Sequence, residues 1–108
     1  MSGQVVNRED VKLSRTDWGS LVNLFDGKVL DTSSAFSFGL ISYKSPHHSG
    51  RHSDNELIFI LRGKGVARIG SELVTFKPGT LLIVAKGTDH GIEEVHGPSV
   101  HGVVVHFL

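Results

Sequence analysis

The sequence contains no cysteine, which excludes disulfide bridges, thiolate metal sites and a cysteine nucleophile. Any metal ion bound by the chain would therefore be held by nitrogen and oxygen atoms. The sequence also has no net charge, because 11 lysines and arginines balance 11 aspartates and glutamates. Since neither sign is concentrated in a run, nothing indicates nucleic acid or an anionic membrane as a partner, and we expect a small-molecule ligand.

Long hydrophobic runs are also missing. The first ten residues, MSGQVVNRED, lack the basic and then apolar order of a signal peptide, and no later stretch approaches the length that spans a bilayer. We therefore expect a cytoplasmic protein. A length of 108 residues is that of one ordinary domain, and the apolar content suffices for a single core.

No helical pattern is visible, and short apolar segments are instead separated by glycine or polar clusters at intervals of about eight to twelve residues. This rhythm is typical of an all-β protein, built as a sandwich or a small barrel. The segments predicted to form strands are SLVNLF from Ser20, AFSFGLISY from Ala35, ELIFIL from Glu56, GVARIG from Gly65, ELVTF from Glu72, TLLIVA from Thr80 and VHGVVVHFL from Val100.

Glycine supplies the turns between these segments. GKG at 63–65 and GS at 70–71 offer the positive φ angles that hairpins use. In KPGT, Pro78 and Gly79 stand where a type II turn requires them.

The segment ELIFIL is apolar on both faces of the strand that it predicts. Because side chains alternate along a strand, Glu56, Ile58 and Ile60 share one face, while Leu57 and Phe59 share the other. One face can line a barrel, and the other must be covered by a second sheet, the amino-terminal segment or another copy of the chain. We expect a homodimer, because so short a chain has little else to place there.

Histidines are concentrated just ahead of this strand, in SPHHSGRHSDNE. The spacing of His48, His52 and Glu56 would suit a helix, but the serines, glycine, aspartate and asparagine between them disfavour one. On one straight strand, His52 and Glu56 would lie about 13 Å apart, too far for metal bonds of about 2 Å. SDN is a strong turn signal, and a turn would bring His52 beside Glu56 on the next strand.

Two segments resemble the motifs of the cupin superfamily. HSDNELIFILRGKG is similar to the first motif, with His52, Glu56 and Gly63 in register, and GTLLIVAKGTDHGIEE is similar to the second, with His90 in register. The resemblance covers about half of the chain. It implies a small single-domain cupin, a double-stranded β-helix or jelly-roll barrel, with His52, Glu56 and His90 as metal ligands.

The predicted domain extends over residues 1–108, with residues 1–19 as an amino-terminal extension and residues 20–108 as the barrel. The resemblance implies one divalent transition metal, which could be iron, manganese, nickel, zinc or copper. Two imidazoles and one carboxylate form a set typical of non-haem iron.

The chain departs from the family pattern at three places. Gly50 stands at the position of the first histidine, Ala85 at that of a proline, and Glu94 at that of an asparagine. A glycine within a strand often marks a bulge, and a bulge here could bring His48 to the vacant ligand position. His47 is a weaker candidate for the same place.

Two functions follow from this interpretation. The first is a metal-dependent enzyme, with a dioxygenase as the first expectation, and an isomerase or lyase as alternatives, acting on a small organic molecule inside the barrel. The second is a binding protein without catalysis, because the segment from Glu56 to Ile92 also resembles the sugar-sensing barrels of some bacterial transcription regulators. No catalytic residue is predicted, and the sequence assigns no role to His101 or His106.

Overall fold

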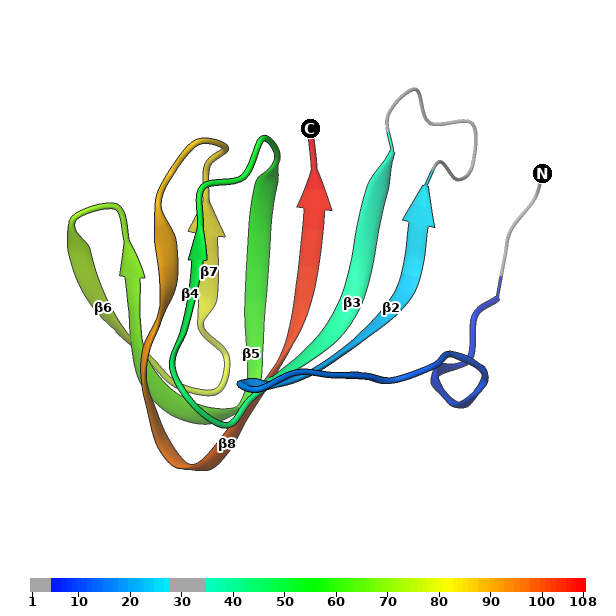
Figure 1. The fold of residues 1–108 in the computed structure, drawn as a ribbon, viewed down its shortest axis with the longest axis horizontal. Helices are drawn as coiled ribbons and strands as arrows, with labels where there is room; N and C mark the ends of the chain where they lie inside the picture. The colour runs from blue at the N-terminus through cyan, green and yellow to red at the C-terminus, as the bar shows by residue number, and fades with distance from the viewer. Residues whose placement is uncertain (1–4, 28–34) are drawn as a thin grey trace.

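The computed structural model describes residues 5–27 and 35–108, and these residues form an almost entirely β structure (Figure 1). The element η1 (Arg8–Asp10) is a single turn of 3-10 helix. The strands are β1 (Ser14–Arg15), β2 (Gly19–Gly27), β3 (Phe36–Tyr43), β4 (His47–Gly50), β5 (Asn55–Ile69), β6 (Glu72–Phe76), β7 (Leu81–Val84) and β8 (His90–Phe107). The all-β prediction is confirmed. No helix within these ranges has the length and apolar character needed to cross a membrane.

The long strands β5 and β8 connect the two halves of the barrel. The carboxyl-terminal part of β8 pairs with β3 and with the start of β5, while β2 continues the sheet beyond β3 and β7 pairs with the start of β5. The amino-terminal part of β8 pairs instead with β4 and with the end of β5, which also pairs with β6. Figure 1 shows both strands curving at the bottom of the view, where they pass from one half to the other. This arrangement is the predicted jelly roll.

Two glycines allow this curve, and the predicted hairpin at GKG is wrong. The strand β5 continues through Gly63, which has a φ of 95°. A Cβ atom there would lie 2.5 Å from the carbonyl oxygen of Ser99, and one at Gly65 would lie 2.7 Å from the ring of Phe76. The two glycines therefore serve close backbone crossing rather than chain reversal.

The other predicted turns are confirmed. Ile69 pairs with Glu72 across Gly70, which has a φ of 61°. In KPGT, the amide of Thr80 donates to the carbonyl of Lys77, and Gly79 takes the positive φ of a type II turn.

The core lies between the two halves, and the predicted alternation along β5 is confirmed. Glu56, Ile58 and Ile60 face inward and are buried, whereas 40% of Phe59 is exposed on the outside. Ile58 and Ile60 belong to a cluster with side chains from other strands: Tyr43, Ala67, Phe76, Leu82, Ile92, Val100 and Val104. Glu56 therefore stands at the end of an apolar row, at the edge of the core.

Candidate metal centre

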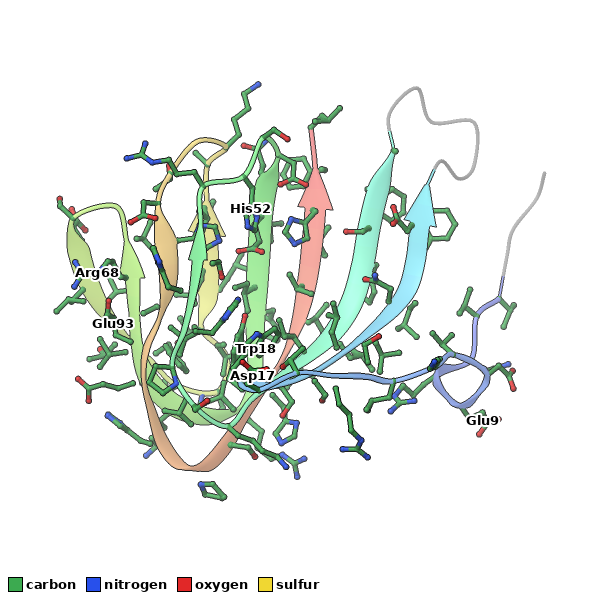
Figure 2. All side chains as sticks on the ribbon, in the orientation of Figure 1. Glu9, Asp17, Trp18, His52, Arg68 and Glu93 are labelled. Carbon is green, nitrogen blue, oxygen red and sulfur yellow. The ribbon has the colours of Figure 1, made fainter. Side chains whose placement is uncertain are left out.

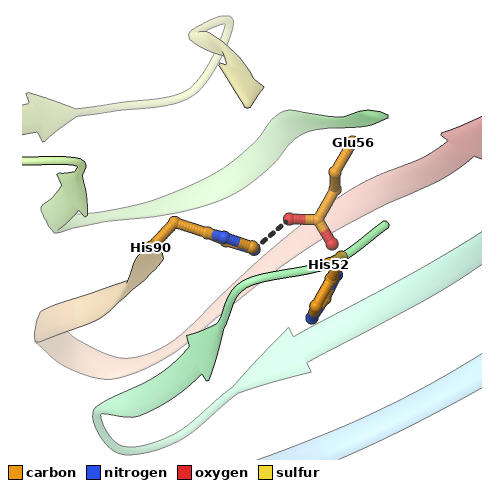
Figure 3. Close-up of side chains that lie close together, drawn as sticks. All are labelled: His52, Glu56 and His90. Atoms are coloured by element: carbon orange, nitrogen blue, oxygen red, sulfur yellow. Dashed lines mark ion pairs between the residues drawn. The ribbon is translucent and has the colours of Figure 1, made fainter. Parts of the chain in front are cut away.

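Three of the predicted ligands meet at the mouth of the barrel. His52 lies in the turn after β4, Glu56 is the second residue of β5, and His90 is the first residue of β8. One ring nitrogen from each histidine and one carboxylate oxygen of Glu56 lie within 4.8 Å of one another. Figure 3 shows the carboxylate of Glu56 between the two imidazoles. The turn at SDN thus places the side chains as expected.

The contact between Glu56 and His90 is close, but with the proton of His90 on Nδ1 it is not a hydrogen bond. Oε2 of Glu56 and Nε2 of His90 are 2.8 Å apart, and both atoms are buried without a hydrogen-bond partner. The other ring nitrogen of His90, Nδ1, donates to the carbonyl of Thr88 at 3.0 Å. In a neutral imidazole, Nε2 then carries a lone pair that faces the carboxylate.

Two lone pairs that face each other in a buried site repel each other, and a cation between them would remove this repulsion. Bonds of about 2.1 Å at a right angle place two ligands of one ion about 3 Å apart, which matches the separation between Glu56 and His90. A carbonyl group behind the imidazole, as Thr88 provides, is the usual partner of a metal-bound histidine. The residues present therefore fit a divalent metal ion.

His52 is held in the same way. Its Nε2 donates to the carbonyl of Ser49 at 3.2 Å, which leaves Nδ1 as the atom with the free lone pair. Its ring packs edge-on against His90, with the ring centroids 4.9 Å apart. Backbone carbonyls thus orient both histidines of the predicted group.

His106, to which the sequence assigned no role, joins this cluster from the end of β8. It is the residue paired with Glu56 across the β5–β8 ladder, and its Nε2 lies 2.9 Å from Oε1 of Glu56. Its Nδ1 donates to the carboxylate of Asp54 at 3.3 Å. The alternation in VVVHF could have indicated His106, because it shares a face with the buried Val104.

The electrostatics of the cluster centre on Glu56. Burial alone would raise the pKa of Glu56, but its contacts with His106 and His90 outweigh burial and lower the pKa to about 2. In turn, the contact with Glu56 raises the pKa of both His90 and His106, against the opposing effect of burial. A fixed negative charge therefore stands beside two imidazoles that attract a proton or a metal ion.

The structure does not bring His48 to this cluster. The predicted bulge is present in β4, between His48 and Gly50, but the side chain of His48 is 68% exposed, and its Nε2 lies 2.8 Å from Oδ1 of Asp89. His47 does face the interior, where its ring stacks on Trp18 with centroids 4.3 Å apart. Burial lowers the pKa of His47 and favours the neutral ring.

A cavity of about 190 Å³ adjoins the cluster. Its walls combine apolar side chains with a larger number that carry hydrogen-bonding groups: Trp18, Leu21, Asn23, Ile41, Tyr43, His47, Ser49, His52, Glu56, Val104 and His106. Burial, with a smaller effect of Glu56, raises the pKa of Tyr43, so this phenol stays neutral. Arg68 is not in the cavity, because it pairs with Glu93 at 2.6 Å, well away from His52 (Figure 2).

The sequence pattern of the cupin domain matches residues 42–106, which is more than half of the chain. The chain belongs to the cupin family. The matched region contains all four residues of the cluster, His52, Glu56, His90 and His106. No curated protein sequence matches this cupin.

Solved structures share the fold of this cupin at low sequence identity. The plu4264 protein from Photorhabdus luminescens has a TM-score of 0.74 and 15% identity, over 98% of this chain and 87% of its own. PAC13 from Streptomyces, a nucleoside dehydratase solved with uridine, has a TM-score of 0.76 and 16% identity, over 98% and 82%. Oxalate decarboxylase OxdC from Bacillus subtilis has a TM-score of 0.77 and 16% identity, over 96% of this chain but 30% of its own. Identities this low show the fold alone.

Proposed function

We propose that this cupin binds one divalent transition metal through His52, Glu56 and His90, and that it acts on a small organic molecule in the adjoining cavity. The observation that carries this proposal is the cluster in which one ring nitrogen each of His52 and His90 and one oxygen of Glu56 lie within 4.8 Å of one another, with the buried Oε2 of Glu56 2.8 Å from Nε2 of His90. Leaving both atoms unpaired would destabilise the fold, whereas a shared cation satisfies both.

The metal, when bound, would supply a Lewis acid that polarises a carbonyl group or activates water or dioxygen. The chain's own residues do the rest. Thr88 and Ser49 hold the imidazoles of His90 and His52 in one tautomer through their carbonyls. Tyr43, as a neutral phenol beside the cavity, can donate a hydrogen bond to an oxygen of the substrate.

The set of histidine and carboxylate ligands favours an oxygenase, with a dioxygenase first, over an isomerase or a lyase. Iron, manganese, nickel, zinc and copper all remain candidates, because each accepts nitrogen and oxygen ligands. The predicted sugar-binding function stays the alternative, because most side chains in the walls of the cavity can form hydrogen bonds, among them Asn23, Tyr43 and Ser49.

The outside of the barrel supports the homodimer that we propose as the assembly. Two rows of apolar side chains cross four paired strands on one face, here called the outer apolar face: Ile83, Leu57, Val105 and Phe38 in one row, and Leu81, Phe59, Val103 and Leu40 in the other. Ile83 is 64% exposed and Leu81 47%. An exposed apolar face made of uncharged side chains suits a second copy of itself around a two-fold axis. The cytoplasmic location stays a prediction from the sequence.

Metal analysis tests the proposed function directly. Protein purified without a histidine tag and stripped with chelator is titrated with iron(II), manganese(II), nickel(II) and zinc(II) at pH 7.5, with calorimetry as the readout. We expect one ion to bind per chain and to raise the melting temperature, because a ligand of the folded state stabilises that state. Negligible binding of all four ions would contradict the proposal.

A further inference from the structure

We infer that His106 is a fourth metal ligand, in place of the histidine that the cupin pattern has at Gly50, and that Asp54 orients it. This inference rests on the metal binding proposed above. It adds a residue that lies outside both cupin motifs, since His106 stands 16 residues beyond His90.

Two groups of side chains that could hold a metal ion share His52: one also contains Glu56 and His90, and the other contains Asp54 and His106. Glu56 and His106 come from paired positions of β5 and β8, and His52 and His90 come from the half that contains β4. Nε2 of His90 lies 2.8 Å from one oxygen of Glu56, and Nε2 of His106 lies 2.9 Å from the other. The ring of His52 is in contact with both imidazoles, at centroid distances of 4.9 Å and 5.6 Å.

The tautomer of His106 is the one that a ligand needs. Its Nδ1 donates to Oδ1 of Asp54, because a carboxylate only accepts, and its Nε2 therefore presents a lone pair toward Glu56 when the ring is neutral. His90 has the same arrangement, with the carbonyl of Thr88 in the place of the carboxylate. A carboxylate behind a ligating histidine is the common outer partner in metal sites and strengthens the ligand.

The place that the cupin pattern gives to the missing ligand is unsuited to a side chain here. Gly50 has a φ of 80°, which a histidine would adopt only with strain, although the space around a Cβ atom there is open. His48, two residues earlier, is paired with Asp89 at the surface. The third imidazole of the proposed site therefore comes from the end of β8 rather than from β4.

The alternative role for His106 is to hold Glu56 in place without binding the metal. Its Nε2 would then carry a hydrogen and donate it to Oε1 of Glu56, and the metal would retain two imidazoles. The two roles differ in an observable way, because Nε2 is bound to metal in the first and to hydrogen in the second.

The test uses full-length protein with zinc(II) and two measurements. Long-range proton–nitrogen spectra of protein with nitrogen-15 histidine distinguish metal-bound, protonated and free ring nitrogens, and zinc affinity is measured by competition with a chelator. The variants are His106→Ala and Asp54→Asn. The matched control is His101→Ala, which alters the same strand five residues away, where the ring contacts the hydroxyl of Ser99.

We expect three imidazoles on zinc in the wild type, from His52, His90 and His106. His106→Ala should leave two and weaken zinc binding by more than about 100-fold, while Asp54→Asn should weaken it by about 10-fold. His101→Ala should change neither measurement. Should His106→Ala fail to fold, the count of imidazoles in the wild type still decides.

Failure of the inference and failure of the proposed function give different results. A wild type that binds zinc through two imidazoles, with hydrogen on Nε2 of His106, would overturn the inference and leave the metal site intact. The inference would also be overturned if the variant His106→Ala had the same affinity for zinc as the wild type. A wild type that binds no zinc, iron, manganese or nickel would instead remove the proposed function itself.

Discussion

The two ends of the barrel differ in what fills the space between the strands. At the mouth, strand ends hold long titratable side chains, and Glu56 and His90 keep atoms without hydrogen bonds in a buried position. At the opposite end, where β5 and β8 curve, the backbones come so close that a Cβ atom at Gly63 would lie 2.5 Å from a carbonyl oxygen. The close backbone packing at the curved end thus stabilises the fold, whereas the mouth carries the side chains of the candidate metal site.

The largest effect is expected from a substitution at the mouth. Glu56→Gln preserves the shape of the side chain but removes the charge that attracts the ion, and we expect metal affinity to fall by more than about 100-fold. Glu94→Gln is the matched control, because Glu94 is exposed and its contact is with His96. Calorimetric titration of both variants gives the comparison. Equal affinities would show that the ion is bound elsewhere.

A substitution at the curved end should change stability instead of metal binding. Gly63→Ala forces a side chain into the crossing at a φ of 95°, and we expect a loss of about 2–4 kcal/mol in the free energy of unfolding. Gly97→Ala has a similar φ of 80° but no neighbour within 4 Å, so strain alone should cost about 1 kcal/mol. Urea denaturation measures both. A loss at Gly63 no larger than at Gly97 would contradict the close crossing.

The mouth should also respond to pH in opposite ways with and without metal. In metal-free protein, the contact with Glu56 raises the pKa of His90 and of His106 above the ordinary value of 6.5. Below pH 6.5 the two histidines therefore contribute fully to the stability of the fold. This contribution declines as the pH rises through the raised pKa. The lowered pKa of Glu56 contributes above about 4.5 and is lost only as the pH falls toward 2.

Melting temperatures of the metal-free protein should therefore fall as the pH rises above about 6.5, as far as this cluster contributes. Metal binding requires neutral imidazoles, so the rise in melting temperature on adding zinc should be larger at pH 7.5 than at pH 5.5. The double variant His90→Gln and His106→Gln serves as the control. A metal effect that does not depend on pH would contradict histidine ligation.

A smaller effect is expected on the outer apolar face, which belongs to neither end. Ile83→Lys places a charge in the proposed dimer contact, and we expect dimers to dissociate without loss of metal affinity. Leu73→Lys is the control, since Leu73 on β6 is equally exposed, at 59%, but lies off that face. Sedimentation velocity at micromolar concentration is the measurement. A wild type that is already a monomer would contradict the proposed assembly.

The smallest effect should come from His48→Ala. The contact of His48 with Asp89 lies at the surface, where such pairs contribute about 0–1 kcal/mol, and the side chain does not approach Glu56. We expect unchanged metal affinity within the error of the titration. A clear loss would revive the ligand role that the sequence alone suggested for His48.

Local patterns in the sequence predicted the features that depend on neighbouring residues. Alternation along ELIFIL located the inward face of β5, and SDN located the turn that joins His52 to Glu56. The first half of β8 was missed, because HGIEEVHGPS mixes glycine, proline and charge in a way that usually indicates a loop. It forms a strand because β4 and β5 supply hydrogen-bond partners on both sides.

The candidate site was also only partly predictable, because local sequence patterns reveal only contacts between residues that are close together in the sequence. His52 and Glu56 are separated by one turn, and His90 was assigned through its motif. The approach of His106 to Glu56 depends on the register between β5 and β8 across 50 residues, including the shifts in pairing near Ile60 and Val66. A local sequence pattern does not reveal the register between these two strands.

The strand β8 carries one residue of the cluster at each end, His90 at its start and His106 near its finish. A bound ion would therefore fasten both ends of a single strand whose middle passes around the far end of the barrel. Peeling β8 away from either side would then require release of the ion as well as loss of the ladder. Amide hydrogens along the whole strand should consequently exchange with solvent in one cooperative step when metal is present, and separately in its two halves when metal is removed.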